Sequence, residues 1–235
     1  GKPSAEMDSI AVIKVFLDGN CSLGNSVYAN SAINGPWGDA LTKEFIPLLE
    51  KNYRANGARL LTGHSSSGWT VLWLQTQYPK VFDACWSSAP DPVDFRAFQK
   101  INIYEDKNAY YDDDGKQFMV ATVAGYFPWA SAKLAYQMEN AVYRGEQMRS
   151  FDAVFSQKGT DGLPQGICNA QTGAINPEVV THWKKYDIAL NLKNDWDTVK
   201  PVLNGKVLVS IGTRDNFLLN YAVMSLEKQM KELNS

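Results

Sequence analysis

The segment Gly63-His64-Ser65-Ser66-Ser67-Gly68 carries the strongest chemical signal in the sequence. An apolar stretch, Ala58–Thr62, precedes it, and residues with helical spacing follow it. A serine at the tip of a tight strand-to-helix turn is held in strained backbone geometry, with its hydroxyl exposed as a nucleophile. Gly63 stands two residues before Ser65, so the spacing of small residues indicates Ser65 as that serine. The backbone N–H of Ser66 would then lie at the helix N-terminus, where it can stabilise an oxyanion.

Ser67 stands where this kind of turn usually has a second glycine. Serine is small, so we expect the turn to close around it. The alternative interpretation is a group of serines that caps the start of an ordinary helix. The position of the group, after an apolar strand and before an apolar helix, favours the catalytic interpretation.

Asp215 is the candidate for the acid that orients a catalytic imidazole. It comes shortly after a predicted strand, Val207–Ile211, and a carboxylate at the carboxyl end of a later strand can reach such a site. Hydrolases with this kind of turn have the chain order nucleophile, acid, histidine. The alternative is a turn aspartate beside Arg214.

The sequence contains only two histidines, His64 and His182. His64 directly precedes Ser65, so its side chain should point to the other side of the strand. His182 comes before Asp215, which is the wrong order, and we expect both histidines to be structural. We therefore expect the chain to be an interior piece of a longer protein, truncated at both ends, with the catalytic histidine beyond Ser235. Residues 1–235 alone should then be inactive.

Strands and helices alternate along much of the chain, which predicts an α/β fold. Parallel strands joined by helices form a mostly parallel sheet with helices on its faces. The predicted strands are Ile10–Leu17, Ala58–Thr62, Val81–Trp86 and Val207–Ile211. The predicted helices cover residues 38–53 and 70–78, and a last helix carries Leu226, Met230 and Leu233 on one face.

Residues 91–200 interrupt this alternation, and we interpret them as a lid-like insertion in a single domain that spans residues 1–235. They contain 16 of the 28 aromatic residues and a predicted helical stretch at 130–155. Ligands bind beyond the carboxyl ends of parallel strands, so we expect the insertion to cover that edge of the sheet. The alternative is a stabilising flap with its own small core. The residues predicted to line the substrate pocket are Ser88, Asp91, Tyr126, Phe127 and Trp129.

Composition excludes several other classes of protein. The net charge of −2 argues against binding to a nucleic-acid backbone, and no apolar run approaches the roughly 20 residues of a membrane span. Three widely spaced cysteines form neither a disulfide scaffold nor a metal clip, and we expect no metal or organic cofactor. The sequence begins with Gly1 and lacks a signal peptide, and an export leader would have to lie upstream.

Several segments resemble the putative esterase family of α/β-hydrolases, the group that includes esterase D and enterochelin-esterase-like proteins. They are DGNCSLGNSVYANSAINGPWG (18–38), FIPLLEKNY (45–53), GHSSSGWTVLWLQTQYP (63–79), WSSAPDPVDFR (86–96) and, more thinly, SFDAVFSQKGTDG (150–162), HWKKYDI (182–188) and GTRDNF (212–217). The resemblance implies an α/β-hydrolase fold and a serine carboxylic-ester hydrolase that acts on a small-molecule or glycan-linked ester. It implies Ser65 as nucleophile, Asp215 as acid and a histidine beyond Ser235. Two alternatives remain, a non-catalytic binding protein on this fold and an acyltransferase that uses the same nucleophile.

Overall fold

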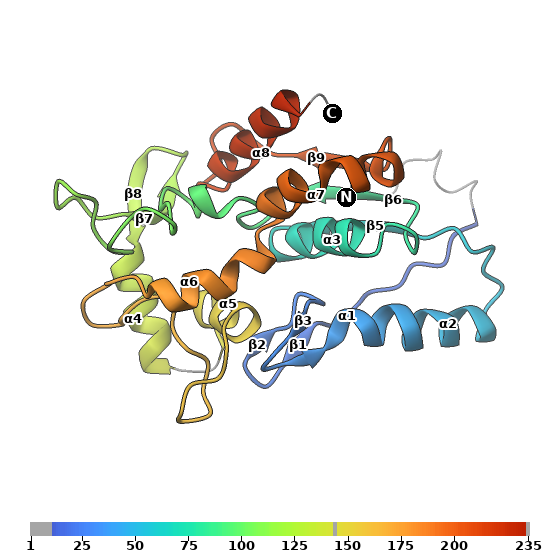
Figure 1. Ribbon diagram of the computed structural model, residues 1–235, viewed down its shortest axis with the longest axis horizontal. Coiled ribbons are helices and arrows are strands. Elements are labelled where there is room, and N and C mark those ends of the chain that lie inside the picture. The colour runs from blue at the N-terminus through green and yellow to red at the C-terminus, as the bar shows by residue number, and fades with distance from the viewer. Residues whose placement is uncertain (1–10, 143–144, 234–235) are drawn as a thin grey trace.

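The molecule contains a three-stranded parallel sheet, which lies in the right half of the view in Figure 1. The computed structural model describes residues 11–142 and 145–233. The strands are β5 (Leu60–His64), β6 (Ala84–Ser88) and β9 (Val207–Ser210), in the order β5-β6-β9. His64 pairs with Ser88, and Ser88 pairs with Ser210. The carboxyl ends of all three strands therefore lie side by side at one edge of the sheet.

One face of the sheet is packed against helices, whereas the other exposes apolar side chains. Helix α3 (Ser66–Gln77) packs on β5 and β6, and α7 (Ile188–Leu203) packs beside α3. Buried side chains of α7 and of α8 (Asn220–Glu232) belong to the same core. The large apolar residues on this second face are Leu60, Trp86 and Leu208, all of them exposed.

The remaining elements lie before and between the strands of this sheet. The stretch before β5 contains β1 (Asn20–Cys21), β2 (Gly24–Asn25), β3 (Asn30–Ser31), β4 (Gly35–Pro36), α1 (Trp37–Asp39), a π-helical turn η2 (Ala40–Phe45) and α2 (Ile46–Asn52). The stretch between β6 and α7 contains η3 (Phe95–Ala97), β7 (Met119–Val123), β8 (Phe127–Ser131), α4 (Ala132–Val142), α5 (Gln147–Phe155), α6 (Pro177–Trp183) and η4 (Lys184–Tyr186).

The predicted alternation of strands and helices is confirmed for three of the four strands, with shifted boundaries. The remaining predicted strand, Ile10–Leu17, is wrong for the described residues. Ile10 lies outside them, and residues 11–19 are irregular, with Phe16 94% exposed. β-Branched residues favour an extended chain, but a strand also needs a neighbour to complete its ladder of hydrogen bonds. In the described part of the chain, β5 pairs only with β6.

The predicted helical stretch at 130–155 is confirmed for most of its described residues, which form two helices, whereas Ala130 and Ser131 belong to β8. Helix α4 ends at Val142, and α5 begins at Gln147. Gly145 between them has a φ of +77°, a conformation that glycine adopts without steric cost. Helices α4 and α5 pack against each other.

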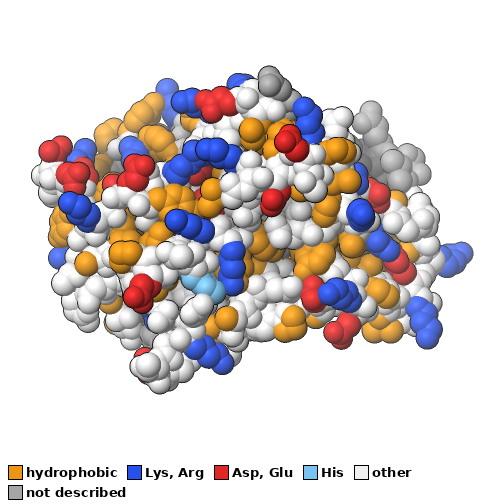
Figure 2. All heavy atoms as spheres, in the orientation of Figure 1, with side chains coloured by type: hydrophobic (Ala, Val, Ile, Leu, Met, Phe, Trp, Pro, Cys, Tyr) orange, Lys and Arg blue, Asp and Glu red, His pale blue; other side chains and the backbone are white. Residues whose placement is uncertain are grey.

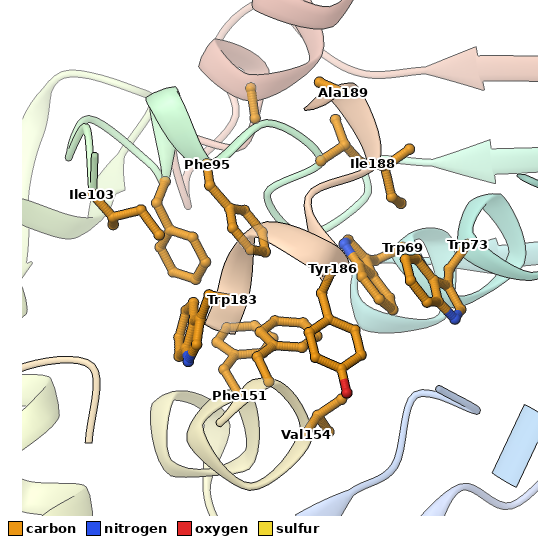
Figure 3. Close-up of a cluster of buried hydrophobic side chains, with 14 of the residues drawn as sticks. Trp69, Trp73, Phe95, Ile103, Phe151, Val154, Trp183, Tyr186, Ile188 and Ala189 are labelled. Atoms are coloured by element: carbon orange, nitrogen blue, oxygen red, sulfur yellow. The ribbon is translucent and has the colours of Figure 1, made fainter. Parts of the chain in front are cut away.

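Several aromatic residues of 91–200 form one buried cluster with the tryptophans of α3 (Figure 3). Trp69 of α3 stacks on Trp73 with a centroid distance of 5.2 Å, and Phe155 of α5 lies 5.3 Å from Trp69. Phe155 also contacts Trp183 and Tyr186, at 5.2 and 5.0 Å. Much of the aromatic content of this region therefore builds a core that it shares with the helix of the predicted nucleophile turn. The boundaries of the insertion, 91 and 200, remain a prediction.

The surface is of mixed charge. Positive and negative side chains are interspersed with apolar ones on the face drawn in Figure 2. None of the helices in the described residues is long and apolar enough to cross a membrane.

Candidate functional site

Ser65 occupies the turn between β5 and α3 in a strained backbone conformation. Its φ of 58° and ψ of −124° lie outside the regions that a residue with a side chain readily adopts, and such strain costs about 1–3 kcal/mol. Hydrogen bonds hold the turn in place. The Ser65 N–H donates to the Ser88 carbonyl (3.0 Å), and the Ser65 carbonyl accepts from the N–H groups of Trp69 (3.0 Å) and Asp91 (3.2 Å). The loop after β6 therefore helps to maintain the strained serine.

Glycines allow this turn to close. A Cβ atom on Gly63 would lie 2.2 Å from the carbonyl oxygen of Ser67, and one on Gly68 would lie 2.7 Å from that of Ser88. Residue 63 therefore has no room for a side chain next to Ser67, and glycine meets this requirement. Ser67 itself is exposed, so its hydroxymethyl group fits at the position where glycine is more usual.

Four side chains form a hydrogen-bonded network at the turn. The carboxylate of Asp91 accepts a bond from the Ser66 hydroxyl (2.5 Å), a bond from the Gln147 amide (2.9 Å) and a long bond from the Ser65 hydroxyl (3.4 Å). The same amide donates to the Ser66 hydroxyl (3.2 Å). Gln147 is the first residue of α5, about 80 residues away in sequence from the serines, and sequence analysis missed it because an isolated glutamine carries no signal.

The carboxyl group of Asp91 is buried, with only 5% of the residue exposed. Burial raises the pKa of Asp91, and the negative charge of Asp215 raises it further, whereas the bonds from Ser66, Gln147 and Ser65 act in the opposite direction. The charge of Asp215 therefore acts on the network that contains Ser65.

Asp215 lies in the loop between β9 and α8, next to the carboxyl end of the sheet. One of its carboxylate oxygens accepts bonds from the backbone N–H groups of Phe217 (2.9 Å) and Leu219 (3.2 Å), which fix the side chain in place. The Ala89 N–H donates to the Ser210 carbonyl (2.7 Å) and joins the loop after β6 to the end of β9. Sheet register thus brings the loops that carry Asp91 and Asp215 to the same edge.

The β7–β8 hairpin adjoins the loop that contains Asp215. The Thr122 N–H donates to the Asn216 carbonyl (2.7 Å), and the Arg214 guanidinium lies 5.1 Å from the centre of the Tyr126 ring. A Cβ atom on Gly125 would lie 3.1 Å from Arg214, so the hairpin tip and the loop are in close contact.

The five predicted pocket residues differ in their contact with the turn and in their exposure. Asp91 contacts both Ser65 and Ser66, and Ser88 contributes its backbone carbonyl. Tyr126 reaches Arg214, next to the candidate acid. Phe127 and Trp129 are 68% and 70% exposed on β8. Their role as a substrate pocket remains a prediction.

Neither histidine forms a hydrogen bond with Ser65. His64 is exposed, and its Nδ1 lies 3.2 Å from the Ser88 hydroxyl. His182 lies on α6, where its Nδ1 is 3.0 Å from the side-chain amide of Gln157. Burial lowers the pKa of His182, and the charge of Lys185 lowers it further, which favours a neutral ring. In the described part of the chain, no three His, Cys, Asp or Glu side chains are grouped to hold a metal ion.

Comparison with known proteins identifies one family. The model of the family described as Putative esterase matches residues 18–234, and this range includes both Ser65 and Asp215. The sequence matches no curated protein.

The strain at Ser65 predicts an unusual order of stability among its variants. Ser65→Gly should be at least as stable as Ser65→Ala, because glycine relieves a strain of about 1–3 kcal/mol at a cost in chain entropy of roughly 0.5–1 kcal/mol. At Ser67, inside α3, the order should be reversed, since glycine weakens an ordinary helix. Urea unfolding of the four variants measures both differences. If glycine is the less stable choice at both positions, Ser65 is not strained.

Proposed function

The chain belongs to the Putative esterase family, and from that premise we propose that it hydrolyses carboxylic esters through an acyl-enzyme formed on Ser65. Family membership supports ester hydrolysis and an α/β-hydrolase fold, and it supports small-molecule esters as substrates. The observation that carries the finer assignment is the backbone of Ser65, with a φ of 58° in the tight turn between β5 and α3. Strained turns of this kind present a serine hydroxyl to substrate.

The first half of the proposed reaction forms the acyl-enzyme. The Ser65 hydroxyl oxygen attacks the carbonyl carbon of the ester while its proton passes to an imidazole. The carbonyl oxygen becomes an oxyanion, and the backbone N–H of Ser66 donates to it. This N–H belongs to the first turn of α3, so it has no acceptor within the helix. Collapse of the intermediate breaks the bond to the alcohol oxygen, which leaves with the proton from the imidazole.

The second half of the reaction repeats these steps with water. The imidazole takes a proton from water, the hydroxide attacks the acyl carbon, and collapse returns the proton to the Ser65 oxygen as the carboxylic acid leaves. Asp215 orients the imidazole and stabilises its positive charge in both halves. The two backbone bonds to its carboxylate hold the side chain in a single orientation.

Ser65→Ala should abolish the hydrolysis of p-nitrophenyl acetate by the full-length protein, because it removes the attacking oxygen. It should also abolish labelling by a fluorophosphonate, which reacts with activated serines. Ser67→Ala is the matched control, since Ser67 is exposed and has no part in the reaction. Hydrolysis at the wild-type rate by Ser65→Ala would rule out this nucleophile.

We assign the proton acceptor to a histidine outside residues 1–235, because neither His64 nor His182 hydrogen-bonds with Ser65. Residues 1–235 alone should therefore turn over p-nitrophenyl acetate several orders of magnitude more slowly than a typical serine esterase. Circular dichroism checks that the chain is folded. Fast turnover by residues 1–235 that is lost in His182→Ala would contradict this assignment.

Asp215→Asn should lower the kcat of the full-length protein by up to about 10⁴-fold with little change in KM, because the imidazole loses its orienting charge. Asp113→Asn, in an exposed turn, controls for the loss of one negative charge. The pair is compared by steady-state kinetics. A normal kcat for Asp215→Asn would show that another residue is the acid.

A further inference from the structure

A buried carboxylate lies against the nucleophile turn and has no role in the proposed reaction. Asp91 is joined to this turn through both its backbone and its side chain. Its N–H donates to the Ser65 carbonyl, and its carboxylate accepts from the hydroxyls of Ser65 and Ser66. Both of its oxygens are thus occupied by groups of the protein.

The donors and acceptors of this network are consistent with one another. The Ser66 hydroxyl donates to Asp91 and accepts from Gln147, and the same Gln147 amide also donates to Asp91. The side chains of Asp91, Ser66 and Gln147 therefore fix one another's orientation. Gln147 is exposed, whereas Asp91 is buried, so the amide lies on the solvent side of the carboxylate. The network also fixes the start of α5 to the start of α3.

We propose that Asp91 is a positioning residue for ester hydrolysis, which holds the Ser65 hydroxyl and the Ser66 backbone N–H in register and is itself held by Gln147. This inference rests on the proposed function, because it assigns a role relative to Ser65 as nucleophile. A reacting group misplaced by about 1 Å can lose 100-fold in rate, so small movements of this turn matter. Since Gln147 belongs to α5, the same contact would align the region between β6 and α7 with the nucleophile.

The buried charge of Asp91 is costly for the folded protein. Burial raises the pKa of its carboxyl group, with a further contribution from the charge of Asp215. A carboxyl group whose pKa is higher in the folded than in the unfolded protein stabilises the fold most below its ordinary pKa. That stability is lost as the pH rises towards the folded pKa. At neutral pH, removal of this charge should therefore leave the melting temperature unchanged or raised.

Asp91→Asn in the full-length protein separates positioning from a structural role. Asparagine keeps the shape and one acceptor oxygen but loses the charge. We expect kcat for p-nitrophenyl acetate to fall about 10–100-fold, with KM nearly constant and no loss in melting temperature. Asp94→Asn is the matched control, because Asp94 is equally buried three residues away but bonds to Arg96 and Ser225. It should leave the kcat of the folded protein unchanged.

Exchange of the two partners gives a rescue experiment. In the double variant Asp91→Asn/Gln147→Glu, the amide of residue 91 can donate to the carboxylate of residue 147, where the charge is nearer to solvent. We expect this variant to recover a large part of the kcat lost in Asp91→Asn. Gln147→Leu, which removes the side-chain amide, should lower kcat less than Asp91→Asn and serves as the test if Asp91→Asn does not fold.

Three results would overturn the proposal. The first is a wild-type kcat in folded Asp91→Asn, or in Gln147→Leu if Asp91→Asn does not fold. The second is a large rise in KM at constant kcat, which would make Asp91 part of the substrate pocket instead. The third is a fall in melting temperature that accounts for the whole loss of activity. The Ser65→Ala variant separates this proposal from the proposed function. If Ser65→Ala is active, both the proposed nucleophile and the positioning role of Asp91 are wrong. If it is inactive, the Asp91 variants decide whether Asp91 positions the turn.

Discussion

The strained turn at Ser65 is the constraint on which the rest of the site depends. A serine with positive φ persists only where its surroundings determine its conformation. Here the Ser65 N–H donates to the carbonyl of Ser88, and the Ser65 carbonyl accepts from the N–H of Asp91. Ser88 is the last residue of β6, and Asp91 lies in the loop after it. The turn is therefore stable only if β6 pairs with β5 in the observed register. The geometry of the site thus depends on the pairing of strands in the parallel sheet.

The shared aromatic core extends this dependence to the region between β6 and α7. Trp69 belongs to the first turns of α3, and Phe155 of α5 packs on it. Gln147 at the other end of α5 reaches the network around Asp91. Helix α5 thus contacts α3 at two places, through an apolar contact and a polar one. The proposed nucleophile would need a rigid support of this kind, because its geometry must be held to within a fraction of an ångström.

Local sequence signals predicted the parts of this structure that depend on neighbouring residues. The spacing of glycine and serine around Ser65 indicated the turn, and the position of Asp215 after an apolar strand indicated the edge of the sheet. Signals of this kind failed for Ile10–Leu17, whose residues favour a strand but whose pairing depends on a partner distant in sequence. The same signals placed Asp91 in a substrate pocket, which stays a prediction. They gave no sign of its burial or of its bonds to Ser66 and Gln147, which arise from tertiary packing. The contact between Gln147 and Asp91 could not be predicted, because the two residues are 56 positions apart and the contact depends on the path of the chain between them.

Two carboxylates near one serine raise the question of how their charges affect the reaction. In the proposed reaction an oxyanion forms beside Ser65, and a second negative charge close to it would oppose that step. Burial makes the charged form of Asp91 costly and raises its pKa, and the charge of Asp215 acts in the same direction. Asp215, in contrast, is only partly buried and is held by backbone N–H groups. Different surroundings give chemically identical groups different roles. In the proposed reaction, Asp91 thus positions the turn, while Asp215 supplies the negative charge that a catalytic imidazole requires.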